Sequence, residues 1–335
     1  MLLGTVSCVQ TPQRHSRPKE TQADLLSQNA HDGGGGDVGS NPTSDGQPPT
    51  TGEAGVSFDA AVGSDAGGSD AGGSGPFPTK LPTVHGPCPT FQTGSVTFQF
   101  KNGSSSARLW IGKNPGNGPL VFYFHGTGMS PDDAKWSLGQ SVIDDILAQG
   151  GVVLSPKGHG QYAWYIADGD TREDDLWLID EMVACAIQEA KIDPRRIHAT
   201  GLSSGATLTS DMVHRRAYYL ASASPKSGGF DPYNPVPKNA DPSNKMGVLI
   251  FHGGASDTWG NPAYEFYQEQ SEKMAGILKQ EGSFATVCNH GKGHTEPTWD
   301  QGTVWQFFKD HPFNVTPKPY ANGLPANFPS YCKIW

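Results

Sequence analysis

The chain has 335 residues, 35% of them hydrophobic, with 43 Gly, 27 Pro and a formal net charge of −9. Residues 1–80 hold nine acidic and four basic residues, a net of −5, so the remainder carries −4. Such a modestly acidic chain lacks the basic surface that binds nucleic acid or an anionic membrane, so neither is predicted as a partner.

The N-terminus, MLLGTVSC, resembles the end of an export signal with a short hydrophobic core. Thr5 to Cys8 is similar to the cleavage box of bacterial lipoproteins, in which the cysteine is acylated. We therefore expect residues 1–28 to be a signal-like N-terminus with Cys8 as a candidate lipid anchor, the alternative being a chance cysteine. No other stretch has the run of about 18 apolar residues that a membrane-spanning helix needs.

Residues 29–80 are rich in Gly, Ser and Asp and almost lack large apolar side chains. Such a segment cannot bury enough surface to offset the entropy lost on ordering it. We predict a disordered linker here, followed by one folded catalytic domain over residues 81–335.

The domain contains short apolar runs that alternate with helical patterns. Strands are predicted at Ser95–Phe100, Ala107–Ile111, Pro119–Phe124, Val152–Ser155, Arg196–Thr200, Met246–Phe251 and Phe284–Cys288. Helices are predicted from about Thr171, from Gly205 to Arg216, from Pro262 to about Lys279, and over Thr303–Lys309. This alternation predicts an α/β fold with a mostly parallel, doubly wound sheet.

Four cysteines besides Cys8 lie in the predicted domain: Cys88, Cys185, Cys288 and Cys332. An even number in an exported protein permits two disulfides, with three possible pairings. Cys88 and Cys332 bracket the domain, so a bridge between its two ends is one expectation. No cysteine or histidine spacing indicates zinc, and no metal site is predicted.

The segment Gly201-Leu202-Ser203-Ser204-Gly205 matches the G-x-S-x-G pattern of a nucleophilic serine on a strand-to-helix turn. The pattern alone is weak in a chain rich in Gly and Ser, but here an apolar strand precedes it and a helical pattern follows. We predict Ser203 as the nucleophile. Ser204, the alternative, is expected to offer its backbone N–H to an oxyanion hole.

A serine hydroxyl needs a base, and the base needs a carboxylate to orient it. In this kind of turn the chain order is serine, acid, histidine. Asp257 follows the strand Met246–Phe251, whereas Asp231 and Asp241 lie in Pro-rich turns and fit less well. His294 leaves the next strand through a glycine-containing loop and is the predicted base, with His290 as the alternative. The remaining candidate, His311, is expected at the surface of the last helix.

The loop His125-Gly126-Thr127-Gly128 directly follows the strand Pro119–Phe124. A loop of this type offers a backbone amide to the oxyanion, and Thr127 is the predicted donor, with Gly128 as the alternative. His125 and His252 are expected to support their loops. Three aromatic residues in loops are candidates for lining a substrate cleft, ordinary packing being the alternative: Trp164, Tyr165 and Trp259.

Several of these segments together resemble secreted feruloyl esterases and polyhydroxybutyrate-depolymerase-like esterases. They are PLVFYFHGTG, the run from DDLWLIDEMV to RRIHATGLSSGATLTSDM, LIFHGGASDTWG, GKGHTEP and VWQFFKDHP, in the family's order over residues 120–312. The resemblance implies an α/β-hydrolase fold and an extracellular carboxylic ester hydrolase with Ser203, Asp257 and His294 as its triad. The sequence departs from the family at Ser204-Gly205-Ala206, beside the serine, which leaves the substrate open.

The expected activity is two-step acyl transfer on aromatic or acetyl esters of polysaccharide, or on a polyester, without metal or cofactor. One alternative is a serine peptidase on the same fold. The other is a surface lipoprotein that binds polysaccharide without catalysis. Loop identities alone do not distinguish these substrates.

Overall fold

The computed structural model describes residues 76–165 and 173–335. The predicted lipoprotein-like N-terminus with Cys8, nearly all of the predicted linker, and the predicted helix start at Thr171 lie outside these residues. None of the described helices is both long and apolar enough to cross a bilayer.

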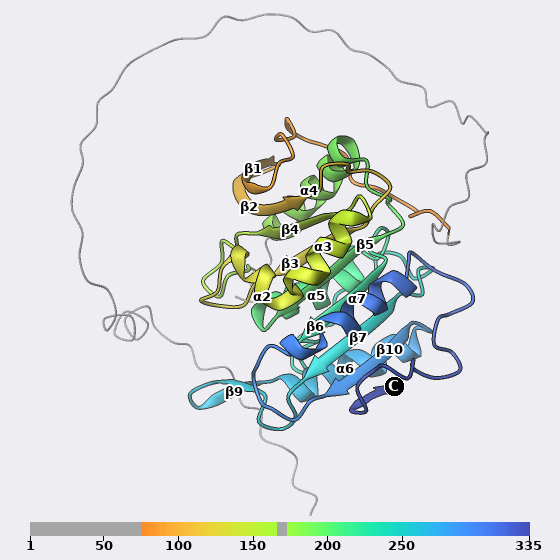
Figure 1. Cartoon of the computed structure of the whole chain (residues 1–335). Helices are drawn as coiled ribbons and strands as arrows, with labels where there is room; N and C mark the ends of the chain where they lie inside the picture. The colour runs from red at the N-terminus through yellow and green to blue at the C-terminus, as the bar shows by residue number, and fades with distance from the viewer. Residues whose placement is uncertain (1–75, 166–172) are drawn as a thin grey trace, which may run out of the picture. The chain divides into compact units, whose positions relative to one another are not determined.

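The described residues form one large mixed sheet, in the order β1-β2-β4-β3-β5-β6-β7-β10-β11 (Figure 1). The six strands from β4 to β10 run parallel, and antiparallel strands flank them on both sides. The strands are β1 Gly94–Phe100, β2 Gly103–Ile111, β3 Leu120–Phe124, β4 Val152–Pro156, β5 Ile197–Leu202, β6 Ser222–Lys226, β7 Gly247–His252, β10 Phe284–Asn289 and β11 Cys332–Ile334.

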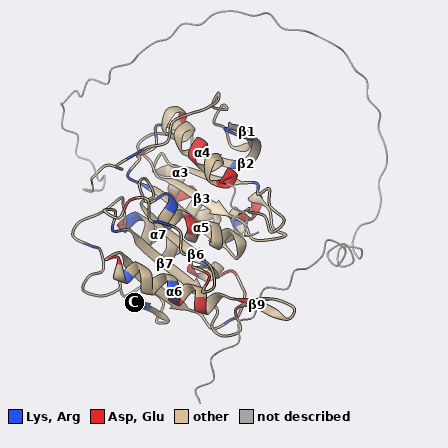
Figure 2. Cartoon of the chain, turned by 180° about the vertical axis from the view of Figure 1, so that it is seen from behind, with Lys and Arg blue, Asp and Glu red and all other residues tan. Residues whose placement is uncertain are grey.

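Helices cover both faces of the sheet. The helices are α2 Ala134–Leu138, α3 Gln140–Ala148, α4 Asp174–Ala190, α5 Ser204–Arg215, α6 Tyr267–Gln280 and α7 Gln301–Asp310. Side chains of a strand alternate between the two faces, so Phe122 and Phe124 pack with α4, α5 and α6, whereas Val121 and Tyr123 pack with α2, α3 and α7. Figure 1 shows α3 and α7 in front of the sheet, and Figure 2 shows α4, α5 and α6 from behind. The predicted mostly parallel, doubly wound sheet is therefore confirmed.

The structure differs from the predicted elements at one strand and at one helix boundary. The strand Ser222–Lys226 was not predicted, because its sequence SASPK has no apolar run. The helix predicted from Pro262 begins only at Tyr267, because the preceding residues form a hairpin instead, β8 Thr258–Gly260 with β9 Ala263–Phe266. A turn at Gly260, whose φ of +101° favours glycine, connects these two strands.

The disulfides are Cys88–Cys185 and Cys288–Cys332. The expected bridge from Cys88 to Cys332 is therefore wrong. Cys88 precedes β1 and Cys332 lies in β11, and these strands form opposite edges of the sheet, roughly 38 Å apart at a strand spacing of about 4.8 Å. Each bridge instead attaches a terminal segment to its own edge, the first to α4 and the second to β10.

His311 is buried, not at the surface as predicted. Its ring stacks on Phe307 with centroids 3.9 Å apart, and its Nδ1 lies 2.8 Å from the Phe307 carbonyl oxygen. A side chain at Gly247 would collide with this ring, so the first residue of β7 has no room for one. Burial lowers the pKa of His311 to about 4, although the hydrogen bond to Phe307 opposes the shift.

This shift predicts a loss of stability in mild acid. Between pH 6.5 and 4 the unfolded chain binds a proton at residue 311 that the folded protein does not, so the free energy of unfolding decreases as the pH falls. The contribution is about 3 kcal/mol over that range. Urea unfolding at several pH values should give a shallower pH dependence for His311→Gln than for the wild type. Identical slopes would contradict the assignment.

Candidate active site

Ser203 lies on the sharp turn between β5 and α5. Its backbone has φ 55° and ψ −121°, a region that residues other than glycine rarely adopt. The strand and helix cross so closely here that a side chain at Gly201 would come within 2.5 Å of the Gly205 carbonyl oxygen. A side chain at Gly205 would collide with the Phe124 carbonyl oxygen on β3. The two glycines of the motif are thus sterically required, and the serine projects from the carboxyl edge of the sheet.

His294 and Asp257 reach the serine from two neighbouring strand ends. His294 Nε2 lies 3.0 Å from Ser203 Oγ, and His294 Nδ1 lies 2.7 Å from Asp257 Oδ1. Ser203 follows β5, Asp257 follows β7 and His294 follows β10, and the carboxyl ends of parallel strands meet at one edge. The structure therefore brings the three residues of the predicted triad into one hydrogen-bonded chain.

The Asp257 carboxylate is buried and saturated with hydrogen bonds. Its second oxygen accepts hydrogen bonds from Ser227 Oγ at 2.8 Å and from the Gly253 N–H at 2.7 Å. Burial by itself raises the pKa of Asp257, but the hydrogen bonds from His294, Gly253 and Ser227 outweigh it and lower the pKa below its usual value. Asp257 is therefore a permanent anion at neutral pH, able to fix the tautomer and orientation of His294.

The side chains of Thr127 and Ser204 are in contact beside the serine turn. Thr127 Oγ1 lies 3.2 Å from Ser204 Oγ and donates a hydrogen bond to the Tyr162 carbonyl oxygen at 3.1 Å. Ser204 is the first residue of α5, so its N–H belongs to the unsatisfied amides of a helix N-terminus. A side chain at Gly126 would lie 3.5 Å from the Ser203 Cβ, which places the loop before Thr127 directly against the nucleophile turn.

The three aromatic candidates differ in position. Trp164 is fully buried and donates from Nε1 to the His125 carbonyl oxygen at 2.8 Å, which corrects the prediction that it lines a cleft. Its large ring fills the space beside Phe124, with centroids 5.5 Å apart. Tyr165 is half-buried, and its N–H donates to Asp175 Oδ2 at 2.6 Å. Its ring stacks on that of His159 at 6.4 Å.

Trp259 lies on the β8–β9 hairpin, two residues beyond Asp257. Its ring contacts Tyr162 edge-on at 5.1 Å and Tyr264 at 5.3 Å. The Tyr162 carbonyl oxygen accepts a hydrogen bond from the Thr127 hydroxyl. The aromatic group of Tyr162, Trp259 and Tyr264 therefore borders the loop that contains Thr127. Trp259 and Tyr264 are partly exposed.

The rejected alternatives have structural roles. Asp231 accepts hydrogen bonds within its own turn, from Tyr233 and Asn234, and Asp241 binds Thr79 and Ser243. His290 Nδ1 accepts the Lys292 N–H at 3.3 Å, and its ring packs edge-on against Trp299 at 5.6 Å. His125 and His252 bond the backbone of their own loops, as predicted. The described residues contain no group of three or more side chains arranged to hold a metal ion.

Tyr267, which no sequence motif indicated, also lies in the site. It is the first residue of α6, and its hydroxyl oxygen lies 3.4 Å from Ser203 Oγ. Its ring stacks on that of His294 at 4.7 Å. No motif includes Tyr267. The sequence placed it only inside the helix predicted from Pro262, five residues before the observed start of α6.

A buried ion pair that the sequence did not predict lies close to the triad. Lys226 Nζ lies 2.5 Å from Glu296 Oε1, and both side chains are within 1% of complete burial. The Ser203 N–H donates to the Lys226 carbonyl oxygen at 3.0 Å, and the next residue, Ser227, donates to Asp257. Glu296 is two residues from His294. Each triad residue is thus connected to the ion pair, either by a hydrogen bond to Lys226 or Ser227 or by two steps along the chain from Glu296.

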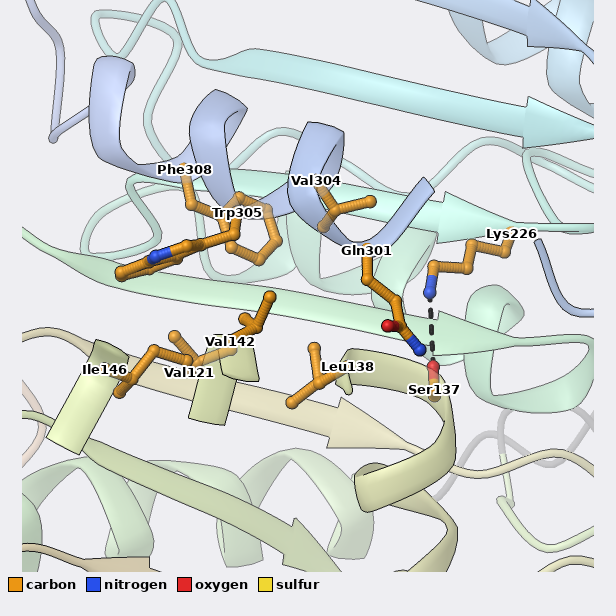
Figure 3. Close-up of a pocket in the computed structure, with 10 residues that line it drawn as sticks. All are labelled: Val121, Ser137, Leu138, Val142, Ile146, Lys226, Gln301, Val304, Trp305 and Phe308. Carbon is orange, nitrogen blue, oxygen red and sulfur yellow. Dashed lines mark hydrogen bonds between the residues drawn. The ribbon is translucent and has the colours of Figure 1, made fainter. Parts of the chain in front are cut away.

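Figure 3 shows where the lysine points. From the end of β6 it reaches Ser137 in α2, at 3.2 Å, on the side of the sheet that α3 and α7 cover. Beside it is a narrow apolar gap that has no room for a water-sized molecule. Its lining comes from the core between β3, α3 and α7: Val121, Leu138, Val142, Ile146, Val304, Trp305 and Phe308, with Gln301. The gap contains no triad residue and is a packing feature, not the substrate site.

We predict that breaking this pair destabilises the protein strongly. Glu296→Gln leaves a buried ammonium without its counter-charge, which costs about 3–5 kcal/mol of the free energy of unfolding. Urea unfolding measures the effect. The double variant Lys226→Met/Glu296→Met removes both charges and should recover most of the loss. A single variant within about 1 kcal/mol of the wild type would show that the pair is not a buried ion pair in solution.

Comparison with known proteins bears on the fold. No known family model matches the chain. Similar solved structures include pOPH in complex with DMSO, with 17% identity, a TM-score of 0.59 and coverage of 76% of this chain and 96% of that chain. Native sOPH has 18% identity, a TM-score of 0.58 and coverage of 76% and 97%. A thermostable esterase has 18% identity, a TM-score of 0.50 and coverage of 64% and 62%.

A relative by sequence is the bifunctional acetylxylan esterase/xylanase of Neocallimastix patriciarum. It is 24% identical over 245 residues, which are 63% of this chain and 34% of that protein. The chain thus matches about a third of the relative's length. The sheet order, the serine turn after β5 and the three structural likenesses lead to one conclusion: the described domain has the α/β-hydrolase fold.

Proposed function

We propose that this protein is a serine carboxylic ester hydrolase. The observation that carries the proposal is the chain of hydrogen bonds from Asp257 through His294 to Ser203, on a turn whose strained backbone presents the hydroxyl. A buried carboxylate, an imidazole and a serine in this order form the arrangement that activates a hydroxyl in neutral water.

Acylation begins when Ser203 Oγ attacks the ester carbonyl carbon and its proton passes to His294 Nε2. The carbonyl oxygen becomes an oxyanion, which the Thr127 and Ser204 backbone amides stabilise by hydrogen bonds. Asp257 stabilises the imidazolium that forms. The bond to the alkoxy group then breaks, and His294 Nε2 protonates the departing alcohol, which leaves an acyl ester on Ser203.

Deacylation repeats these steps with water as the nucleophile. His294 takes a proton from the water as its oxygen attacks the acyl carbon, and the same two amides bind the second oxyanion. The bond between that carbon and Ser203 Oγ then breaks, and His294 returns the proton to the serine. The carboxylic acid leaves, and the enzyme regains its starting state.

The proposed substrates are aromatic or acetyl esters of a polysaccharide, or a polyester. The acetylxylan esterase relative supports a polysaccharide ester, and the aromatic group around Trp259 next to the site supports a ring-containing or sugar-bearing substrate. Both disulfides fit an exported protein, because such bonds persist in oxidising compartments. Export and lipidation at Cys8 remain part of the proposal.

A fluorophosphonate probe tests the chemistry directly. The wild type should be labelled covalently, and Ser203→Ala should abolish labelling and decrease kcat/KM by about 10⁴-fold or more, because no other group replaces the nucleophile. Mass spectrometry of the labelled peptide identifies the residue, and Ser204→Ala, which keeps its backbone N–H, serves as the matched control. Absence of labelling in folded wild type would favour a non-catalytic polysaccharide-binding protein.

A substrate panel then distinguishes the acyl classes. Methyl ferulate, p-nitrophenyl acetate, acetylated xylan and a polyester film cover the proposed range, and a set of peptide substrates represents the serine peptidase alternative. Hydrolysis of at least one ester with no peptide cleavage is the expected result. Peptide cleavage with a higher kcat/KM than any ester would contradict the esterase assignment.

A further inference from the structure

Tyr267 is in contact with every member of the triad. Its backbone N–H donates to the Asp257 carbonyl oxygen at 3.0 Å, and its ring lies nearly parallel to the His294 imidazole, at 4.7 Å and 16°. Its hydroxyl oxygen lies 3.4 Å from Ser203 Oγ. Tyr267 is 4% exposed, so its side chain is largely shielded from bulk water.

The direction of the hydroxyl contact follows from the proton inventory. Ser203 Oγ has one proton, and the proposed mechanism requires that proton to be donated to His294 Nε2, 3.0 Å away. Its lone pairs can only accept, so the Tyr267 hydroxyl is the donor. Burial raises the pKa of Tyr267, the hydrogen bond with Ser203 opposes the shift, and the charges of Glu265 and Asp257 raise the pKa further. The phenol therefore keeps its proton at neutral pH.

The distance of 3.4 Å is long for a bond between two hydroxyl groups, which is usually about 2.7–2.8 Å. Catalytic hydrogen bonds are often long in the free enzyme and shorten in the transition state. Ser203 Oγ gains negative charge at two points: when it loses its proton during attack, and when the bond from the acyl carbon to Oγ breaks during deacylation. A hydrogen bond donated to Ser203 Oγ becomes stronger at both points, because a negatively charged acceptor strengthens a hydrogen bond.

We propose that Tyr267 is a further catalytic residue, whose hydroxyl stabilises the charged Ser203 Oγ while its ring holds the His294 imidazole in plane. The proposal rests on the proposed function of the triad. Tyr267 exchanges no proton in this role: it donates a hydrogen bond while the serine proton moves to His294 and back. Its backbone bond to Asp257 fixes the position of both groups.

The test separates the hydroxyl from the ring. Tyr267→Phe removes one oxygen atom and keeps the stacking, so we expect kcat for p-nitrophenyl acetate and the second-order rate of fluorophosphonate labelling to fall about tenfold, with KM unchanged. Tyr267→Leu also removes the stacked ring, and a further decrease of about tenfold is expected from the misplaced base. If Tyr267→Leu does not fold, the Phe variant alone decides.

The matched control is Tyr219→Phe, which removes another buried phenol hydroxyl, bonded to Asp180 at 2.9 Å. It should leave the labelling rate within twofold of the wild type. The proposal for Tyr267 is overturned if Tyr267→Phe also labels and turns over within twofold of the wild type while Ser203→Ala is inactive. An unlabelled wild type would instead overturn the proposed function, so the two failures are distinguishable.

Discussion

The close crossing of β5 and α5 at Ser203 is the constraint on which the site depends. Its backbone conformation is unfavourable for a residue with a side chain, and it persists only because the strand before it and the helix after it are both firmly packed. Gly201 and Gly205 allow the crossing, since any side chain there would collide with the neighbouring backbone. The same geometry places the hydroxyl at the edge of the sheet and the N-terminus of α5 beside it.

The rest of the site is connected to this turn through buried polar contacts. Lys226 accepts the Ser203 N–H through its carbonyl oxygen, and its side chain pairs with Glu296 close to His294. Breaking such a buried pair is costly, because either charge alone would be desolvated without compensation. The pair is thus well suited to hold loops that leave three different strands at one fixed spacing, which a catalytic arrangement requires.

The aromatic residues proposed to face the substrate are partly exposed. Trp259 and Tyr264 lie on a short hairpin outside the main sheet and contact Tyr162 from the loop opposite. Specificity in this fold resides in loops such as these, whereas the triad resides on the ends of the sheet. The proposed triad therefore leaves the choice of acyl and alcohol groups to these loops.

The sequence alone determined the α/β class, most strand positions, and Ser203, Asp257 and His294 as the residues to bring together, because each follows an apolar strand and parallel strands share one carboxyl edge. Only the tertiary structure decided the disulfide pairing, the burial of Trp164 and His311, the contacts of Tyr267, and the pair Lys226–Glu296. Most of these features depend on contacts between residues distant in the chain. They leave no periodic or motif signal, since nothing local to either partner requires the other.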